Sequence, residues 1–196
     1  MKKSLIALAV MAACAHGLVR ARTLDTAFTY RMGAGFPGDI NRAHPFSALP
    51  SIQDPTTPVR SYGHAVLFDA TNNSIRGFTA ADTAVTKIKG VLVRPYPNSQ
   101  TTGGMNASFG AATPPGARNV VDYLEDGFIL VKVDNIAAGA PAKGSAVFVW
   151  CAASAGNDIQ GGFRCAASAG NTAAIVNAEW NGPADANGIA EIRVWK

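Results

Sequence analysis

The feature that most constrains the fold is a series of short apolar, β-branched runs separated by clusters of turn residues. The runs lie at residues 63–69, 75–78, 84–95, 120–125, 128–134, 146–152, 159–165, 172–180 and 188–195. No convincing amphipathic helical pattern appears after residue 24. Short strands this closely spaced, with Gly, Asn and Pro between them, predict an all-β sandwich or barrel.

The dipeptide Asp126-Gly127 is the strongest turn signal, because Asp-Gly readily adopts the backbone of a tight hairpin turn. It separates residues 120–125 from residues 128–134. We therefore predict a hairpin closed at this point. The neighbouring carboxylates of Glu125 and Asp126 are expected to be solvated at the turn, which argues against an acid/base pair.

Alternation in the second strand of that hairpin predicts which face is buried. Ile129, Val131 and Val133 lie on one side, and Phe128 and Leu130 lie on the other. The uniformly β-branched side is the predicted core face.

The heptapeptide CAASAGN occurs twice, at residues 151–157 and 165–171. Each copy follows a strand-like run and enters a Gly-Asn turn, which predicts two similar strand ends in neighbouring hairpins; two copies are too few for a solenoid. Cys151 and Cys165 could face each other across a hairpin, or be two small buried thiols. With Cys14 the cysteine count is odd, and the spacing of cysteines and histidines suggests no metal site.

Composition excludes several classes of function. The net charge of +4 comes from scattered Lys and Arg residues, whereas nucleic-acid binding needs a dense basic stripe. No apolar run approaches the roughly 20 residues of a membrane span. Charged residues make up 15% of the chain, which fits either a surface covered by partners or a neutral β domain.

Residues 1–22 have the pattern of a secretory signal peptide. Lys2 and Lys3 precede an apolar run at residues 5–15, and Ala13-Cys14-Ala15 resembles a small-residue cleavage site. Residues 11–14 also weakly resemble a lipobox. The alternative is a retained apolar helix, which would have to bury its surface against a partner subunit.

Residues 29–45 form an irregular segment punctuated by Gly and Pro, and they carry Arg31, Asp39, Arg42 and His44. Such a segment cannot be a helix or a central strand. Long ordered loops usually have a function, and the role we expect here is to grip another protein.

No motif for catalysis is present. A nucleophile elbow and a phosphate-binding loop are both missing from the sequence. His64 begins a strand and His44 lies in a loop, where structural or hydrogen-bonding roles are the better interpretation. The chain is therefore predicted not to be an enzyme, and to bind no cofactor and no metal ion.

Five segments of the chain resemble the structural cement proteins that decorate the capsids of tailed bacteriophages. They read TYRMGAGFPGDINRAHPFS, GVLVRPYP, FGAATPP, DYLEDGFILVKV and NAEWNGPADANGIAEIRV, and they extend from about residue 29 to residue 194. The resemblance implies a β-rich, jelly-roll-like domain that binds the outside of the major capsid protein and bridges neighbouring capsomers. It also implies a homo-oligomer, with a dimer favoured over a trimer.

The resemblance assigns residues 31–45 to capsid contact. Arg31 and Arg42 would bond to capsid carboxylates, and Phe36 would be the apolar anchor; the alternative is that this loop packs internally. The residues of the hypothetical contact are Arg31, Phe36, Asp39, Arg42 and His44.

The resulting organisation has three parts. Residues 1–28 form an N-terminal arm, residues 29–62 an extended contact region, and residues 63–196 the β-sandwich or jelly-roll domain. Residues 98–119, which lack periodicity, form a second long loop, either a mobile tip or another interaction loop.

A virion protein assembles in the host cytosol and needs no export signal. The resemblance therefore favours a retained arm or a mis-called start codon for residues 1–22, together with reduced cysteines. The alternative function is a secreted or lipid-anchored bacterial β-sandwich binding protein.

Overall fold

One long strand organises the domain. The computed structural model describes residues 35–95, 114 and 116–196, so Arg31, the N-terminal arm and most of the predicted loop at residues 98–119 lie outside the described residues. Its strands are β1 (Ser47–Ile52), β2 (Ala65–Asp69), β3 (Ser74–Arg76), β4 (Gly90–Leu92), β5 (Val120–Lys132), β6 (Ala146–Trp150), β7 (Phe163–Arg164), β8 (Thr172–Trp180) and β9 (Ile189–Val194). Two short 3₁₀ helices, η1 (Ala80–Ala84) and η3 (Ile136–Ala138), complete the described elements. The prediction of an all-β fold is confirmed.

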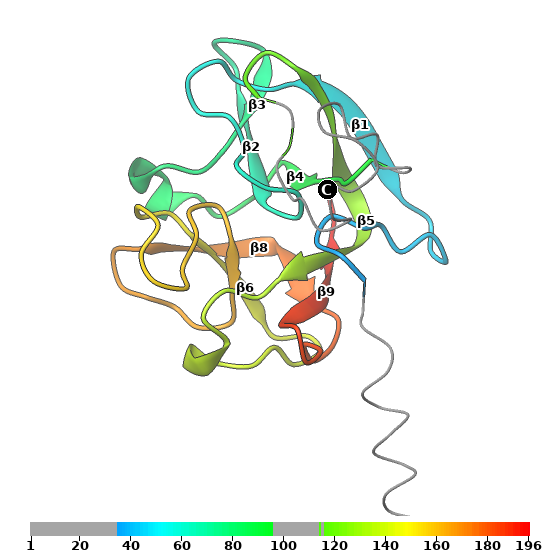
Figure 1. Ribbon diagram of the computed structural model, residues 1–196, viewed down its shortest axis with the longest axis vertical. Coiled ribbons are helices and arrows are strands. Elements are labelled where there is room, and N and C mark those ends of the chain that lie inside the picture. The colour runs from blue at the N-terminus through cyan, green and yellow to red at the C-terminus, as the bar shows by residue number, and fades with distance from the viewer. Residues whose placement is uncertain (1–34, 96–113, 115) are drawn as a thin grey trace, which may run out of the picture. The chain divides into compact units, whose positions relative to one another are not determined.

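All strand pairs are antiparallel, and the sheet order is β3-β2-β4-β5-β9-β8-β6-β7, with β1 also paired to β5. Strands β1 and β4 pair with the first part of β5, and β9 pairs with the second part, so β5 joins the two halves of the sheet (Figure 1). Phe163 in β7 bridges back to Val133, just after β5. The sheet therefore curls until its last strand meets the end of its central one.

The predicted hairpin at Asp126-Gly127 is wrong, because residues 120–132 form one continuous strand. Gly127 has a φ of 132°, and a Cβ there would lie 2.9 Å from the Cβ of Phe46. Its partner is Val194 in β9, whereas Asp126 still pairs with Ser47 in β1. Glycine thus permits the unusual backbone at the point where β5 leaves one partner strand for another.

Glu125 is also not the solvated turn residue that was predicted. It is 4% exposed, and its carboxylate pairs with the Nζ atoms of Lys89 and Lys196 at 2.5 and 2.9 Å. Hydrogen bonds from these two lysines lower the pKa of the Glu125 carboxyl. The continuous strand places this side chain within reach of both cations, which a solvent-exposed turn would not.

The main core lies inside the curl, and the predicted inner face of β5 is confirmed. Ile129 and Val131 are fully buried and Val133 is 4% exposed. They pack with large side chains such as Trp180 and Phe163 from β8 and β7. Burying each such side chain contributes about 1.5–3 kcal/mol of transfer free energy. A second buried cluster lies under β2 and β4 and contains Val59, Tyr62, Val66, Ile75, Leu92, Val121 and Tyr123.

The run at residues 84–95 is mostly not a strand, and only Gly90–Leu92 pairs in the sheet. The amide side chain of Asn177 binds the run at Ile88. Its Oδ1 accepts from the N–H of Ile88, and its Nδ2 donates to the carbonyls of Ile88 and Trp195. A side chain therefore replaces part of the strand ladder for this segment.

The two CAASAGN segments follow β6 and β7, as predicted, and Gly156 and Gly170 both have positive φ. Cys151 is buried and Cys165 is half-buried, and both thiols are free. Burial raises the pKa of each thiol to about 11. At neutral pH both cysteines are therefore protonated and poorly nucleophilic.

Candidate functional site

The loop at residues 35–45 is held to the sheet through its backbone. The N–H of Gly38 donates to the carbonyl of Leu130 at 2.7 Å, and the N–H of Leu130 donates to the carbonyl of Asp39 at 2.9 Å. On the other side, the N–H of Arg94 donates to the carbonyl of Gly38 at 2.8 Å. The loop thus lies between β5 and the end of β4, where several main-chain hydrogen bonds hold it.

Close approach explains the glycine at position 38. Gly38 has a φ of 91°, and a Cβ there would lie 2.9 Å from the backbone nitrogen of Arg94. The Asp39 carboxylate accepts a hydrogen bond from the N–H of Phe36 at 3.0 Å and closes the turn before it. Of the predicted contact residues, Asp39 therefore has a local structural role.

The other predicted contact residues within the described part point outward. Phe36 is 46% exposed, and the Arg94 guanidinium lies 4.8 Å from its ring. Arg42 and His44 are exposed. The His44 and Phe128 rings have centroids 4.6 Å apart. The loop contributes an apolar ring, a cation and an imidazole to one exposed segment.

The sheet adds residues that the sequence did not single out. Phe128 pairs directly with Arg193, so both side chains lie on the outer face of β5 and β9. The Arg193 guanidinium lies 5.8 Å from the rings of both Phe128 and Trp195. We call His44, Phe128, Arg193 and Trp195 the outer patch. Outward alternation against the buried Ile192 and Val194 is the sequence signal that could have identified Arg193.

A hydrogen bond between side chains also ties the loop to this face. The Nδ2 of Asn41 donates to Oε1 of Glu191 at 2.8 Å, and Asn181 donates to Oε2 of the same carboxylate. Glu191 pairs with Leu130 in the sheet. The loop and the outer patch therefore form one continuous surface.

Comparison with known protein families matches residues 26–194 to the XM1 gp53 minor capsid protein family. This chain belongs to that family. The resemblance to structural proteins of phage capsids is thereby confirmed, and so is the prediction that the chain is not an enzyme.

A solved structure, the capsid of Myoviridae phage XM1, contains a chain with a similar fold. The TM-score is 0.60 at 21% sequence identity, and the match covers 85% of this chain and 93% of that chain. Among the curated proteins no match is found.

Within the described residues no group of three His, Cys, Asp or Glu side chains is placed to hold a metal ion. In the same part of the chain no helix has the length and apolar character needed to cross a membrane. Aromatic rings stacked with arginines are typical of protein interfaces.

Proposed function

We propose that this minor capsid protein binds the outside of the major capsid protein lattice and stabilises the shell by bridging neighbouring capsomers. The observation that carries the proposal is the loop at residues 35–45, whose backbone is fixed on β5 and β4 while Phe36, Arg42 and His44 stay exposed. A contact segment that is already ordered loses less conformational entropy on binding.

Each side chain has a distinct role in this proposal. Phe36 enters an apolar pocket of the capsid protein, since buried aromatic anchors dominate interface energies. Arg42, together with Arg193 of the outer patch, forms charge-assisted hydrogen bonds to capsid carboxylates. Arg31 is assigned the same role on sequence grounds.

The proposal retains the three-part organisation: an arm at residues 1–28, a contact region at residues 29–62 and a β domain at residues 63–196. The arm would dock on a neighbouring subunit, and the protein would self-associate, with a dimer favoured over a trimer. Many copies tethered to one lattice act through effective concentration, so weak single contacts add to a large gain in shell stability.

A depletion and add-back experiment tests the contact surface. Shells lacking this protein are incubated with the full chain or with the double variant Phe36→Ala/Arg42→Ala, and occupancy is measured by quantitative mass spectrometry. We expect at least a tenfold loss of apparent affinity for the double variant, with Lys143→Ala as an exposed control that binds normally. Equal occupancy by all three proteins would reject the role of the loop.

The mass of the mature protein tests the alternative, a secreted or lipid-anchored binding protein, which the signal-like residues 1–22 support. An intact N-terminus in purified virions agrees with the capsid proposal. Cleavage after Ala15, or a diacylglycerol on Cys14, would favour export instead.

A further inference from the structure

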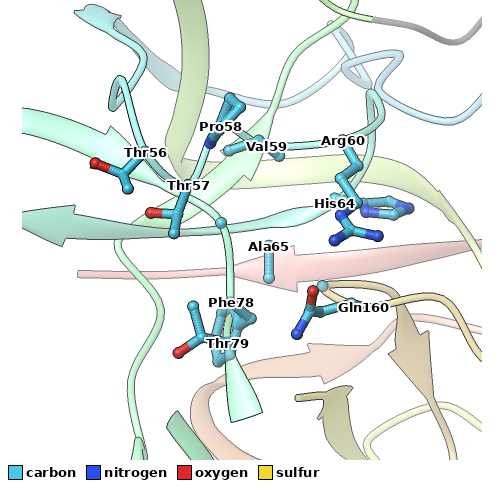
Figure 2. A pocket seen from close by; sticks show the side chains of 12 residues that line it. Thr56, Thr57, Pro58, Val59, Arg60, His64, Ala65, Phe78, Thr79 and Gln160 are labelled. Carbon is cyan, nitrogen blue, oxygen red and sulfur yellow. The ribbon is translucent and has the colours of Figure 1, made fainter. Parts of the chain in front are cut away.

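A cavity of about 230 Å³ lies between four segments of the chain. Its walls are the turn at residues 56–60, His64-Ala65 at the start of β2, residues 77–79 after β3, and Gln160-Gly161 before β7 (Figure 2). This volume is below the range typical of drug-sized ligands.

A buried carboxylate holds the first wall. Oδ1 of Asp54 accepts from the N–H groups of Thr56 and Thr57 at 2.8 and 2.7 Å, and its Oδ2 accepts from Nδ2 of Asn72 at 2.7 Å. Burial opposes ionisation of Asp54, but these hydrogen bonds outweigh it and keep the pKa of the carboxyl well below its usual range. The turn is therefore held in place before any ligand arrives.

The walls at residues 77–79 and at Gln160-Gly161 are held in the same way. Asp82 accepts from the N–H of Thr79 at 2.7 Å and pairs with both terminal nitrogens of Arg76 at 2.8 Å. Asp134 accepts from the N–H of Ile159 at 3.1 Å, next to Gln160. All three carboxylates are thus committed to the protein's own donors, and none of them lines the cavity.

The only cationic side chain among the lining residues is Arg60, which is exposed. None of the lining residues is acidic, and within the described part of the chain Arg60 has no carboxylate partner. Figure 2 shows the Arg60 guanidinium on the same side as the Gln160 carboxamide, beside the imidazole of His64. His64 is 8% exposed, and burial lowers its pKa to about 4, so it is neutral at pH 7. Ala65 and Phe78 supply apolar surface.

We propose that this cavity is a socket for a carboxylate side chain, such as that of glutamate, from a protein partner. The guanidinium of Arg60 binds the carboxylate in its two-pronged geometry, and the methylene groups lie on Ala65 and Phe78. The site adds a second contact to the proposed function, and it does not require that the loop binds the capsid.

Titration of the full-length protein with small probes tests the socket without using shells. The probes are N-acetylglutamate amide, its neutral glutamine counterpart, and inorganic phosphate, followed by the NMR signals of His64, Gln160 and Gly161. We expect saturable shifts with the glutamate probe alone. Equal response to the glutamine probe, or tighter binding of phosphate, would overturn the assignment to a carboxylate side chain.

Substitutions of Arg60 test whether its guanidinium binds the glutamate probe. Arg60→Gln should weaken binding of the glutamate probe at least tenfold, whereas Arg60→Lys should retain part of the affinity because it keeps the charge without the planar fork. Lys143→Gln removes an exposed charge elsewhere and should change nothing. Unaltered affinity in Arg60→Gln would refute the socket, and this result would leave the shell-binding role of the loop untouched.

Discussion

Two regions of the domain are held in irregular conformations by different means. The loop at residues 35–45 is held by main-chain hydrogen bonds to β5 and to Arg94, and its one carboxylate, Asp39, is only half-buried and accepts from a single N–H. The cavity walls also share main-chain hydrogen bonds, such as that from the N–H of Gly77 to the carbonyl of Thr57, but their turns are in addition held by the buried carboxylates of Asp54, Asp82 and Asp134. In the loop, main-chain hydrogen bonds leave Phe36, Arg42 and His44 exposed. Around the cavity, carboxylates that accept several hydrogen bonds fix the turns that form its walls.

The difference has an electrostatic consequence. Main-chain pairing is insensitive to pH, but buried carboxylates link wall geometry to their ionisation. The loop and the cavity should therefore respond differently to acid, to base and to substitution.

Removing the Asp54 hub should have the largest effect. Asp54→Ala leaves the N–H groups of Thr56 and Thr57 and the amide of Asn72 without their acceptor, and we expect the free energy of unfolding to fall by about 4 kcal/mol. Asp39→Ala, the matched change in the loop, should cost less than about 1 kcal/mol. Urea denaturation measures both, and equal losses would remove the contrast between the two regions.

Ionisation of Asp134 should lower the stability of the fold, whereas ionisation of Asp54 should raise it. Burial raises the pKa of Asp134 to about 6, so its contribution to stability is present below about pH 4 and is lost as pH rises through 6. The shift corresponds to about 3 kcal/mol. Asp134→Asn should therefore be more stable than the natural protein at pH 8, but not at pH 4. Thermal melts at both pH values test this, and a variant that is less stable at pH 8 would contradict it.

Asp54 has a lowered pKa, so its contribution is present above about pH 4 and is lost as pH falls further. The loss of stability caused by Asp54→Asn should therefore become much smaller in acid. The stabilities of Asp134→Asn and Asp54→Asn, relative to the natural protein, should therefore change with pH in the ways described. The stabilities of the loop variants should show neither change.

Detaching the loop should have an intermediate effect. Gly38→Ala places a Cβ against the backbone of Arg94 at a positive φ, which should cost about 2 kcal/mol locally. The amide of Leu130, which bonds to Asp39, should exchange its hydrogen faster. Gly182→Ala has open space and serves as the control. Unchanged exchange at Leu130 would show that main-chain pairing does not hold the loop.

The smallest effect on stability is expected for His44→Ala, which removes an exposed ring contact with Phe128. The loss should be below about 1 kcal/mol, while shell occupancy should fall measurably in the depletion assay. A loss of stability without a loss of binding would indicate that His44 serves the fold alone.

The sequence predicted those features of the fold that depend on neighbouring residues, such as strand alternation and turns. Alternation identified the buried face of β5, and a cluster of turn residues separated the runs that become β2 and β3. The Asp126-Gly127 signal was misread, since positive φ serves a hairpin turn and a change of partner strand equally well. The sequence records the backbone requirement at Gly127 but not which strands lie on either side.

The candidate site divides in the same way. Residues 35–45 were recognisable as a loop from Gly, Pro and charge, and Phe36, Arg42 and His44 are exposed as a contact surface requires. Phe128, Arg193 and Trp195 joined them only through the pairing of β5 with β9. The same holds for the cavity, where Arg60 and Gln160 are a hundred residues apart in the chain.

The sequence by itself determined that this chain forms strands, that turn residues separate β2 from β3, and which loop is too polar to be buried. These properties follow from the side-chain and backbone preferences of neighbouring residues. Tertiary structure alone decided that β5 is unbroken, that Glu125 is buried between two lysines, and that three carboxylates surround one hollow. Those outcomes depend on contacts between distant segments, whose energies no local pattern contains.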